Sequence, residues 1–301
     1  MTQTAKLLNA KKKRAIKKYL FIASFLIVPL LLLITFTYLP LVGLAGFSFT
    51  WWNTIEPPEW VGFQNYIEIF TRRAYWTALV NSLYYLVATF IQLGLALFFA
   101  AVLTFTKRFS KIFRAFIFFP FLLNGVAAGL MFRLFFTPEI GTLYAIFQLL
   151  GITAPASFLA LPIWNNVMLA SVSVWRFMGL NFVMFLGVMA SVDKELYEAA
   201  KLDGANSWQI FWSIIFKSIL PVIFLNMILA VRGALTVFEV PYIITGGSDG
   251  TSTFVIEAYR ISIQRAPLNV GMGSALSIVM LLIVIAATIV QKIFFREDTD
   301  V

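Results

Sequence analysis

The stretch NSLYYLVATFIQLGLALFFAAVLTF, residues 81–105, contains no charged side chain and decides the fold class. A helix needs about 20 apolar residues to cross the hydrocarbon layer of a bilayer. A transmembrane β-barrel would show segments of about ten residues with alternating polarity, and no such alternation occurs. We therefore predict an all-α polytopic membrane protein with six transmembrane helices, which lie within 19–49, 76–106, 115–136, 163–191, 218–244 and 270–291.

Composition agrees with a membrane protein and excludes several enzyme chemistries. Hydrophobic residues make up 60% of the 301 positions and charged residues 12%, whereas about 25% of an average soluble domain is charged. Cysteine and histidine are both absent, so neither zinc ligation by these residues nor a Ser/His/Asp or Cys/His arrangement can form. We therefore predict no metal, no catalytic residue and no enzymatic activity.

The positions of Lys and Arg predict the orientation of the chain. Sixteen of the 23 fall in the N-terminal segment, in the connections after the second and fourth helices, and near the C-terminus. Lys and Arg accumulate on the cytosolic side of membrane proteins, so both termini are expected in the cytosol. The net charge of +9 then faces anionic lipid of the bilayer, and no nucleic-acid partner is predicted.

One transmembrane domain at 19–295 is expected, between a cytosolic basic N-terminus at 1–18 and a cytosolic tail at 296–301. The first apolar stretch follows KKKRAIKK but is longer than a signal-peptide core, so we expect it to be retained. Three outer loops are predicted. They are an interfacial segment with an amphipathic tail (WWNTIEPPEWVGFQNYIEIFTRRAYW), a short helix lying over the bundle (GTLYAIFQLLGITAPAS) and a turn-rich cap (TGGSDGTST).

The connection at 192–217 is predicted to be a compact cytosolic helix-turn-helix. DKELYEAAKL is rich in strong helix formers and places Leu196, Ala199 and Ala200 on one side. Gly204 permits a positive φ, so the first helix can end and the chain can turn sharply. The following SWQIFWSIIF would lead back to the membrane. A solvated connection without further function is the alternative interpretation.

This connection resembles the EAA loop of permease subunits in bacterial ATP-binding-cassette (ABC) importers. Phe216 and Lys217 depart from that pattern, because they stand where the motif has Leu-Pro, and Leu220 and Pro221 follow instead. Three further segments are similar to sugar permeases of the maltose and glycerol-phosphate type: VGFQNYIEIF with AYWTALVNSL, VFEVPYIITGGSDGTSTFVIEAYR and NVGMGSALSIVMLLIVIAATIVQ. The match to the EAA motif covers Glu198, Ala199, Ala200, Gly204 and Ile214, and Tyr197 and Asp203 fit the sugar-permease branch.

The resemblance implies the fold of a type I ABC importer permease and half of a pore for a sugar or oligosaccharide, in the bacterial cytoplasmic (inner) membrane. It also implies four kinds of partner: a second homologous permease, two ATPase subunits, an extracytoplasmic solute-binding protein and the lipid bilayer. No G-x-x-x-x-G-K-[ST] motif occurs, so ATP and Mg are expected on the ATPase partners. The residues expected to couple the pore to the ATPase are Glu198, Ala199, Ala200, Asp203 and Gly204.

Two alternatives remain open from the sequence. Related permeases share the EAA loop, so the solute could be an amino acid, an osmolyte or a polyamine. An ion-coupled secondary transporter is the second alternative, but such proteins place acidic or His side chains in their helices as relays. Glu239 is the one acidic residue within a predicted span.

Polar side chains within the apolar spans are candidates for the solute pathway, since such groups usually face the protein interior or water. Arg232 and Glu239 are seven residues apart, which predicts a shared face of one helix about two turns long. The alternative for each residue is structural: it forms an ion pair or an amide–backbone hydrogen bond that only holds helices together. Gly125 and Gly129 form a GxxxG that predicts close helix packing. The pathway candidates are Asn124, Arg176, Asn181, Asn226, Arg232, Glu239 and Tyr242.

Overall fold

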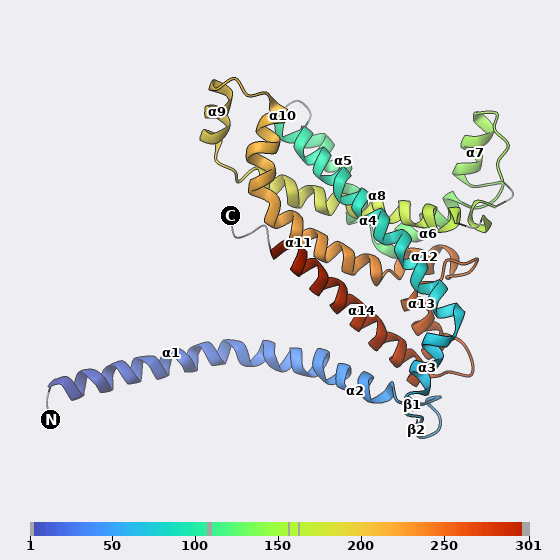
Figure 1. The fold of residues 1–301 in the computed structure, drawn as a ribbon, viewed down its shortest axis with the longest axis horizontal. Coiled ribbons are helices and arrows are strands. Elements are labelled where there is room, and N and C mark those ends of the chain that lie inside the picture. Colours follow the sequence, from blue (N-terminus) through green and yellow to red (C-terminus); the bar gives the residue numbers. More distant parts are fainter. Residues whose placement is uncertain (1–2, 107–109, 156, 162, 297–301) are drawn as a thin grey trace.

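The computed structural model describes residues 3–106, 110–155, 157–161 and 163–296, and this part of the chain is mostly helical (Figure 1). Five of its helices are long and apolar enough to cross a membrane, and a bent helix pair counted as one span makes six. The predicted all-α polytopic fold is confirmed. Lys107, Arg108 and residues 297–301 of the predicted tail lie outside the described residues.

The first span belongs to a long helix that stands apart from the other helices over most of its length and reaches them only at its C-terminal end (Figure 1). Helix α1 (Gln3–Leu33) continues through a π-helical turn, η1 (Ile34–Tyr38), into α2 (Leu39–Phe47). The predicted basic segment is thus continuous with the first span. None of the most apolar stretch of this helix is buried within the chain. A contiguous apolar surface of this kind indicates contact with lipid or with another protein.

A small strand pair and a short helix follow the first span. Strands β1 (Thr50–Trp51) and β2 (Glu59–Trp60) pair antiparallel, and α3 (Gln64–Thr71) is the expected amphipathic tail. The buried amide of Asn65 fixes α3 to the strand pair, since it donates to the carbonyls of Ser48 and Thr50 at 2.9 Å. The sequence did not predict the strands because two residues are too few to show an alternating pattern.

Four long helices form the centre of the bundle. They are α4 (Arg73–Phe105), α8 (Trp164–Met189), α11 (Phe216–Leu235) and α14 (Val270–Arg296). Helices α4 and α8 contact each other along their length. Fully buried Ala96 and Ala100 of α4 lie in one core cluster with Phe182 and Phe185 of α8. Small residues at such a crossing let two helix backbones approach closely.

The third predicted span, 115–136, is not one straight helix, so this prediction was wrong in its geometry. The structure has α5 (Ser110–Leu122) and α6 (Gly125–Phe135), which meet at 94°. The Asn124 side chain accepts a hydrogen bond from the Val126 N–H at 2.9 Å and caps α6. Such an N-cap starts a new helix. An apolar stretch therefore indicates membrane depth but does not indicate where the helix changes direction.

The loops at one end of the bundle carry several short elements besides α3. Helix α7 (Thr142–Leu149) is the expected short helix, but it projects from the bundle rather than lying over it (Figure 1). A 3-10 turn, η2 (Phe158–Ala160), packs against it. After α12 (Glu239–Thr245), the cap predicted from TGGSDGTST leads into α13 (Phe254–Tyr259) and a π-helical turn, η4 (Arg260–Gln264). Asn81 of α4 ties this cap to the bundle through the carbonyls of Gly250 and Ser252, at 2.7 and 2.8 Å.

The opposite end of the bundle carries the predicted helix-turn-helix. Helix α9 (Lys194–Leu202) and helix α10 (Ser207–Ile210) are followed by a π-helical turn, η3 (Phe211–Ile215). This turn continues directly into α11, so the chain stays helical across Phe216 and Lys217, where the EAA motif has Leu-Pro.

Candidate functional site

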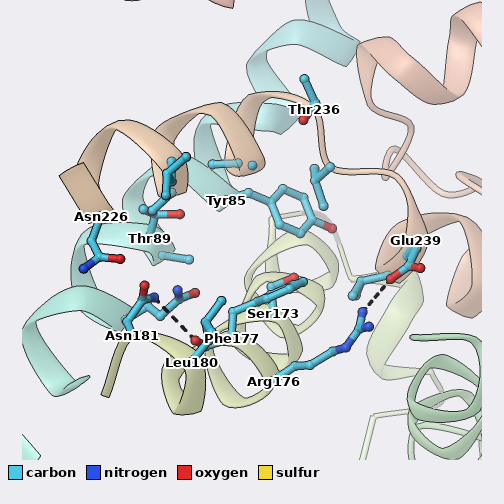
Figure 2. A pocket seen from close by; sticks show the side chains of 18 of the residues that line it. Tyr85, Thr89, Ser173, Arg176, Phe177, Leu180, Asn181, Asn226, Thr236 and Glu239 are labelled. Atoms are coloured by element: carbon cyan, nitrogen blue, oxygen red, sulfur yellow. Dashed lines mark hydrogen bonds and ion pairs between the residues drawn. The ribbon is translucent and has the colours of Figure 1, made fainter. Parts of the chain in front are cut away.

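A cavity of about 410 Å³ lies within the helix bundle, between α4, α8, α11 and the segment that connects α11 to α12 (Figure 2). This volume falls within the range of about 300–1,000 Å³ that is usual for small-molecule sites. Most of the wall is apolar, with polar groups from α4, α8, α11, α12 and the segment between α11 and α12. The residues that line it are Tyr85, Ala88, Thr89, Gln92, Ser173, Arg176, Phe177, Leu180, Asn181, Met184, Asn226, Leu229, Ala230, Gly233, Ala234, Thr236, Val237, Phe238, Glu239 and Val240.

Part of the polar wall comes from residues that sequence reasoning missed. Tyr85, Thr89 and Gln92 line the cavity from α4, at positions i, i+4 and i+7 of one helical face. Ser173 lines it from α8, three residues before Arg176. The polar stripe on α4 was visible as a helical spacing within an apolar span. Hydroxyl groups and Gln amides recur so often in apolar spans that composition alone did not single out these four residues.

Several buried polar atoms of the cavity have no hydrogen-bond partner within the described part of the chain. These atoms are Tyr85 Oη, Ser173 Oγ, Arg176 Nε and Asn226 Oδ1. Tyr85 is 2% exposed and Asn226 1%. A buried polar group without a partner costs about 1–3 kcal/mol, so each of these side chains would gain by turning toward a solute that enters the cavity. Together they offer hydroxyl and N–H donors and an amide oxygen acceptor, which is the complement of a polyhydroxylated solute.

Arg176 and Glu239 form an ion pair in the wall of the cavity (Figure 2). Arg176 Nη1 lies 2.5 Å from a carboxylate oxygen of Glu239, and the exposed fractions of the two side chains are 11% and 52%. The predicted shared face of Arg232 and Glu239 is therefore wrong. Helix α11 ends at Leu235, and Glu239 opens α12.

The break between α11 and α12 has a local cause. Pro241 has no N–H to donate to the carbonyl four residues earlier, that of Val237, and its ring would clash there in a continuous helix. The Thr253 hydroxyl donates to the Val237 carbonyl instead, at 2.8 Å. The break thus turns Glu239 away from the α11 surface that carries Arg232 and toward Arg176.

The GxxxG of α6 packs closely against α12, as predicted. A Cβ on Gly125 would collide with the Glu239 carboxylate and would come within 2.7 Å of Arg176 Nη1. A Cβ on Gly129 would lie 2.7 Å from Ile243 Cγ2. The bend between α5 and α6 therefore brings a side-chain-free backbone against the ion pair, and any larger residue at Gly125 would displace it.

Four of the seven predicted pathway residues line the cavity: Arg176, Asn181, Asn226 and Glu239. The other three do not. Asn124 caps α6 as described, and Arg232 is exposed on α11 outside the cavity. Tyr242 stacks on Phe238, which does line the cavity, at 4.7 Å between ring centroids.

The predicted coupling residues lie on and just after α9. The Asp193 side chain caps the start of this helix by accepting from the Glu195 N–H at 3.0 Å. At its end Gly204 has φ +80, and a pair of hydrogen bonds closes the turn: Gly204 N–H to the Lys201 carbonyl (3.1 Å) and Ala205 N–H to the Ala200 carbonyl (2.9 Å). This is the Schellman arrangement, which needs a left-handed residue at the position of Gly204.

Helix α9 presents two different faces, and the predicted shared side of Leu196, Ala199 and Ala200 is only partly observed. Ala200 and Tyr197 pack against the core cluster of α4, α8 and η3. Burial raises the pKa of the Tyr197 phenol, which donates to the Met189 carbonyl at 3.3 Å. Leu196 and Ala199 point away from the bundle, and the exposed fraction of the nearby Leu202 is 89%. The outer face of α9 is therefore available to another protein.

A family model defines the class of this protein. Residues 92–297 match the model described as "Binding-protein-dependent transport system inner membrane component". The match covers more than half of the chain, so the chain belongs to this family of multi-pass membrane transport components.

Individual relatives agree over nearly the whole length. The chain is 32% identical over 250 residues to the osmoprotective compounds uptake permease protein GgtC of Synechocystis sp. (80% of this chain, 87% of the relative). It is 29% identical over 275 residues to the multiple sugar-binding transport system permease protein MsmF of Streptococcus mutans (89% and 92%). A chain of a bacterial alginate ABC transporter, solved in complex with an alginate pentasaccharide-bound periplasmic protein, has the same fold with a TM-score of 0.83 at 20% identity (95% and 97%).

Proposed function

We propose that this chain is the membrane-spanning permease subunit of an ABC importer and forms half of the translocation pore for a sugar or oligosaccharide. The observation that carries the proposal is the cavity between α4, α8 and α11, where buried hydroxyl, amide and guanidinium groups lack partners within the described part of the chain. These groups can bond sugar hydroxyls. The multiple-sugar relative supports the same solute class. The osmoprotectant relative supports a small osmolyte as the second candidate.

The remaining pore half and the energy source belong to partner chains under this proposal. A second homologous permease completes the pore, two ATPase subunits hold ATP and Mg, and an extracytoplasmic binding protein delivers the solute. The family's dependence on a binding protein supports the last of these. The distribution of Lys and Arg supports a cytosolic location for both termini and for α9.

The outer face of α9 is proposed to dock on an ATPase subunit. Exposed Leu202 offers an apolar contact at this face, and Glu198 and Asp203 offer carboxylates close to it. Ala200 and Tyr197 hold the opposite face against the bundle. A rigid helix that contacts both a moving partner and the helix core can transmit a conformational change, because its contacts differ between the two conformations of the partner.

The division of labour predicts that the chain alone does not transport. In proteoliposomes, rapid uptake of the sugar should require the second permease, the ATPase, the binding protein and ATP, and orthovanadate should stop it. The lone chain should give only background flux. Robust uptake by the lone chain that an uncoupler of the proton gradient abolishes would instead establish a secondary transporter.

The cavity assignment predicts an effect of removing one oxygen atom. Tyr85→Phe in the complete transporter should raise the KM for uptake about 3–10-fold, because a net hydrogen bond is worth about 0.5–1.5 kcal/mol. The amount of assembled complex should not fall, because the hydroxyl that is removed has no hydrogen-bond partner within the described part of the chain. Tyr84→Phe is the matched control, because the neighbouring Tyr84 lines a separate apolar groove between α4 and α8. Equal KM values for the two variants would remove Tyr85 from the solute site.

A further inference from the structure

The cavity carries two charges of opposite sign. Among the residues that line it, Arg176 and Glu239 are the two charged side chains, and the other polar lining groups are hydroxyls and amides. The wall therefore has no net charge, although a guanidinium group lies in it.

Glu239 occupies only part of the hydrogen-bonding capacity of Arg176. The Nη1 group is committed to the carboxylate at 2.5 Å, whereas the buried Nε has no partner within the described residues. Figure 2 shows both side chains at the end of the cavity next to α12. Arg176 can thus donate a hydrogen bond to a neutral oxygen without releasing Glu239.

The backbone around the ion pair holds it in place. Gly125 at the start of α6 packs directly on both charged groups, and the proline-dependent break before α12 points Glu239 at Arg176. Three elements that are distant in the sequence therefore meet at this pair: α6, α8 and α12. Such an arrangement is more than a chance surface contact, because the side-chain-free position leaves room for the two charged groups and for nothing larger.

We propose that Glu239 is a specificity-determining residue that neutralises Arg176 and so excludes acidic saccharides from the cavity in favour of uncharged ones. This inference rests on the proposed function. An anionic solute would have to compete with Glu239 for the guanidinium while lying beside an acidic group of the same charge. Like charges a few ångströms apart repel, and the partial exposure of Glu239 weakens this repulsion without removing it. Specificity often depends on such a repulsive element. A neutral sugar meets no such penalty.

Glu239→Gln tests this inference directly. The substitution preserves the shape of the side chain but leaves Arg176 without a counter-charge. The full chain in lipid nanodiscs is titrated with three neutral disaccharides (maltose, lactose and trehalose) and with digalacturonate, and weak binding is read by saturation-transfer NMR. The wild type should prefer at least one neutral sugar. In Glu239→Gln the affinity ratio should shift toward digalacturonate by at least tenfold.

Two further variants make the result specific. In Arg176→Gln/Glu239→Gln the cavity is neutral again, so the ratio should return to within about threefold of the wild-type value. Glu68→Gln breaks an exposed ion pair with Arg72 outside the cavity and should leave the ratio unchanged.

The role inferred for Glu239 and the proposed function would be contradicted by different outcomes. A folded Glu239→Gln chain with a wild-type ratio would overturn the inference and leave the proposed function standing. If Glu239→Gln does not fold, a double variant that strongly prefers digalacturonate would overturn it as well. Failure of the wild-type chain to bind any of the probes would overturn the cavity as a sugar site, and the inference with it.

Discussion

Replacing Gly204 with Val should reduce ATP-driven uptake at least tenfold while leaving the chain inserted in the membrane. Gly204 adopts φ +80, and a Cβ at this position would meet no atom within 4 Å. The expected damage is therefore conformational rather than steric. A residue held in a sparsely populated backbone region costs about 1–3 kcal/mol, and β-branched side chains are least compatible with positive φ. The turn should open, and the hydrogen bonds to the Ala200 and Lys201 carbonyls should be lost.

The measurement compares uptake with ATP hydrolysis in the reconstituted transporter. If α9 couples the pore to the ATPase, hydrolysis in Gly204→Val should no longer respond to the loaded binding protein, or the ATPase should dissociate. Gly204→Asn should retain most of the uptake, because Asn tolerates the left-handed conformation. Uptake that decreases in the order Gly, Asn, Val at position 204 would therefore indicate a requirement for positive φ.

The chain contains a matched control for this substitution. Gly151, which follows α7 at the other end of the molecule, has φ +67 and an equally open environment for a Cβ. The same pair of turn hydrogen bonds closes its helix, to the carbonyls of Gln148 and Phe147. Gly151→Val should thus suffer the same backbone strain without loss of coupling. Equal uptake by Gly151→Val and Gly204→Val would show that the turn after α9 has no special role in transport.

The parts of the fold that the sequence predicted are those that depend on local composition. Apolar stretches of sufficient length indicated the spans, and helix formers followed by Gly204 indicated the helix and turn at 192–217. The bend between α5 and α6 was missed because hydropathy does not depend on helix direction. Its cause was nonetheless in the sequence, since Asn124 is a strong N-cap residue within an apolar span.

The candidate site was predicted in part, for a related reason. Assigning Arg232 and Glu239 to one helical face assumed a continuous helix, and Pro241 invalidates that assumption. The partner of Glu239 is 63 residues away on α8, so no local spacing could have found Arg176. The stripe of Tyr85, Thr89 and Gln92, by contrast, has a period that could have been read from the sequence. What the sequence could not supply is which stripe on α4 faces which stripe on α8, because that depends on tertiary packing.

Replacing Gly179 with Val should destabilise the chain more than any substitution at a lipid-facing position. Gly179 is the buried residue of α8 at which α5 crosses. A Cβ there would collide with the Ile117 carbonyl oxygen and would lie 2.9 Å from the Phe118 Cα. Both obstacles are backbone atoms, so no side-chain rotation can relieve the clash. The two helices must separate, and overpacking of this kind costs about 1–3 kcal/mol or more.

Gly187 on the same helix is the control for Gly179, because it is exposed and a Cβ there would meet no atom within 4 Å. Val is a better helix former than Gly, so Gly187→Val should melt at or slightly above the wild-type Tm in nanodiscs. Gly179→Val should melt several degrees lower and yield less monodisperse protein. It should also bind sugar more weakly, because displacement of α5 moves α6 and the Gly125 contact away from the Arg176–Glu239 pair. Equal melting temperatures for the two variants would show that α5 and α8 do not cross in close contact. The bend between α5 and α6 would then have no packing to fix its direction.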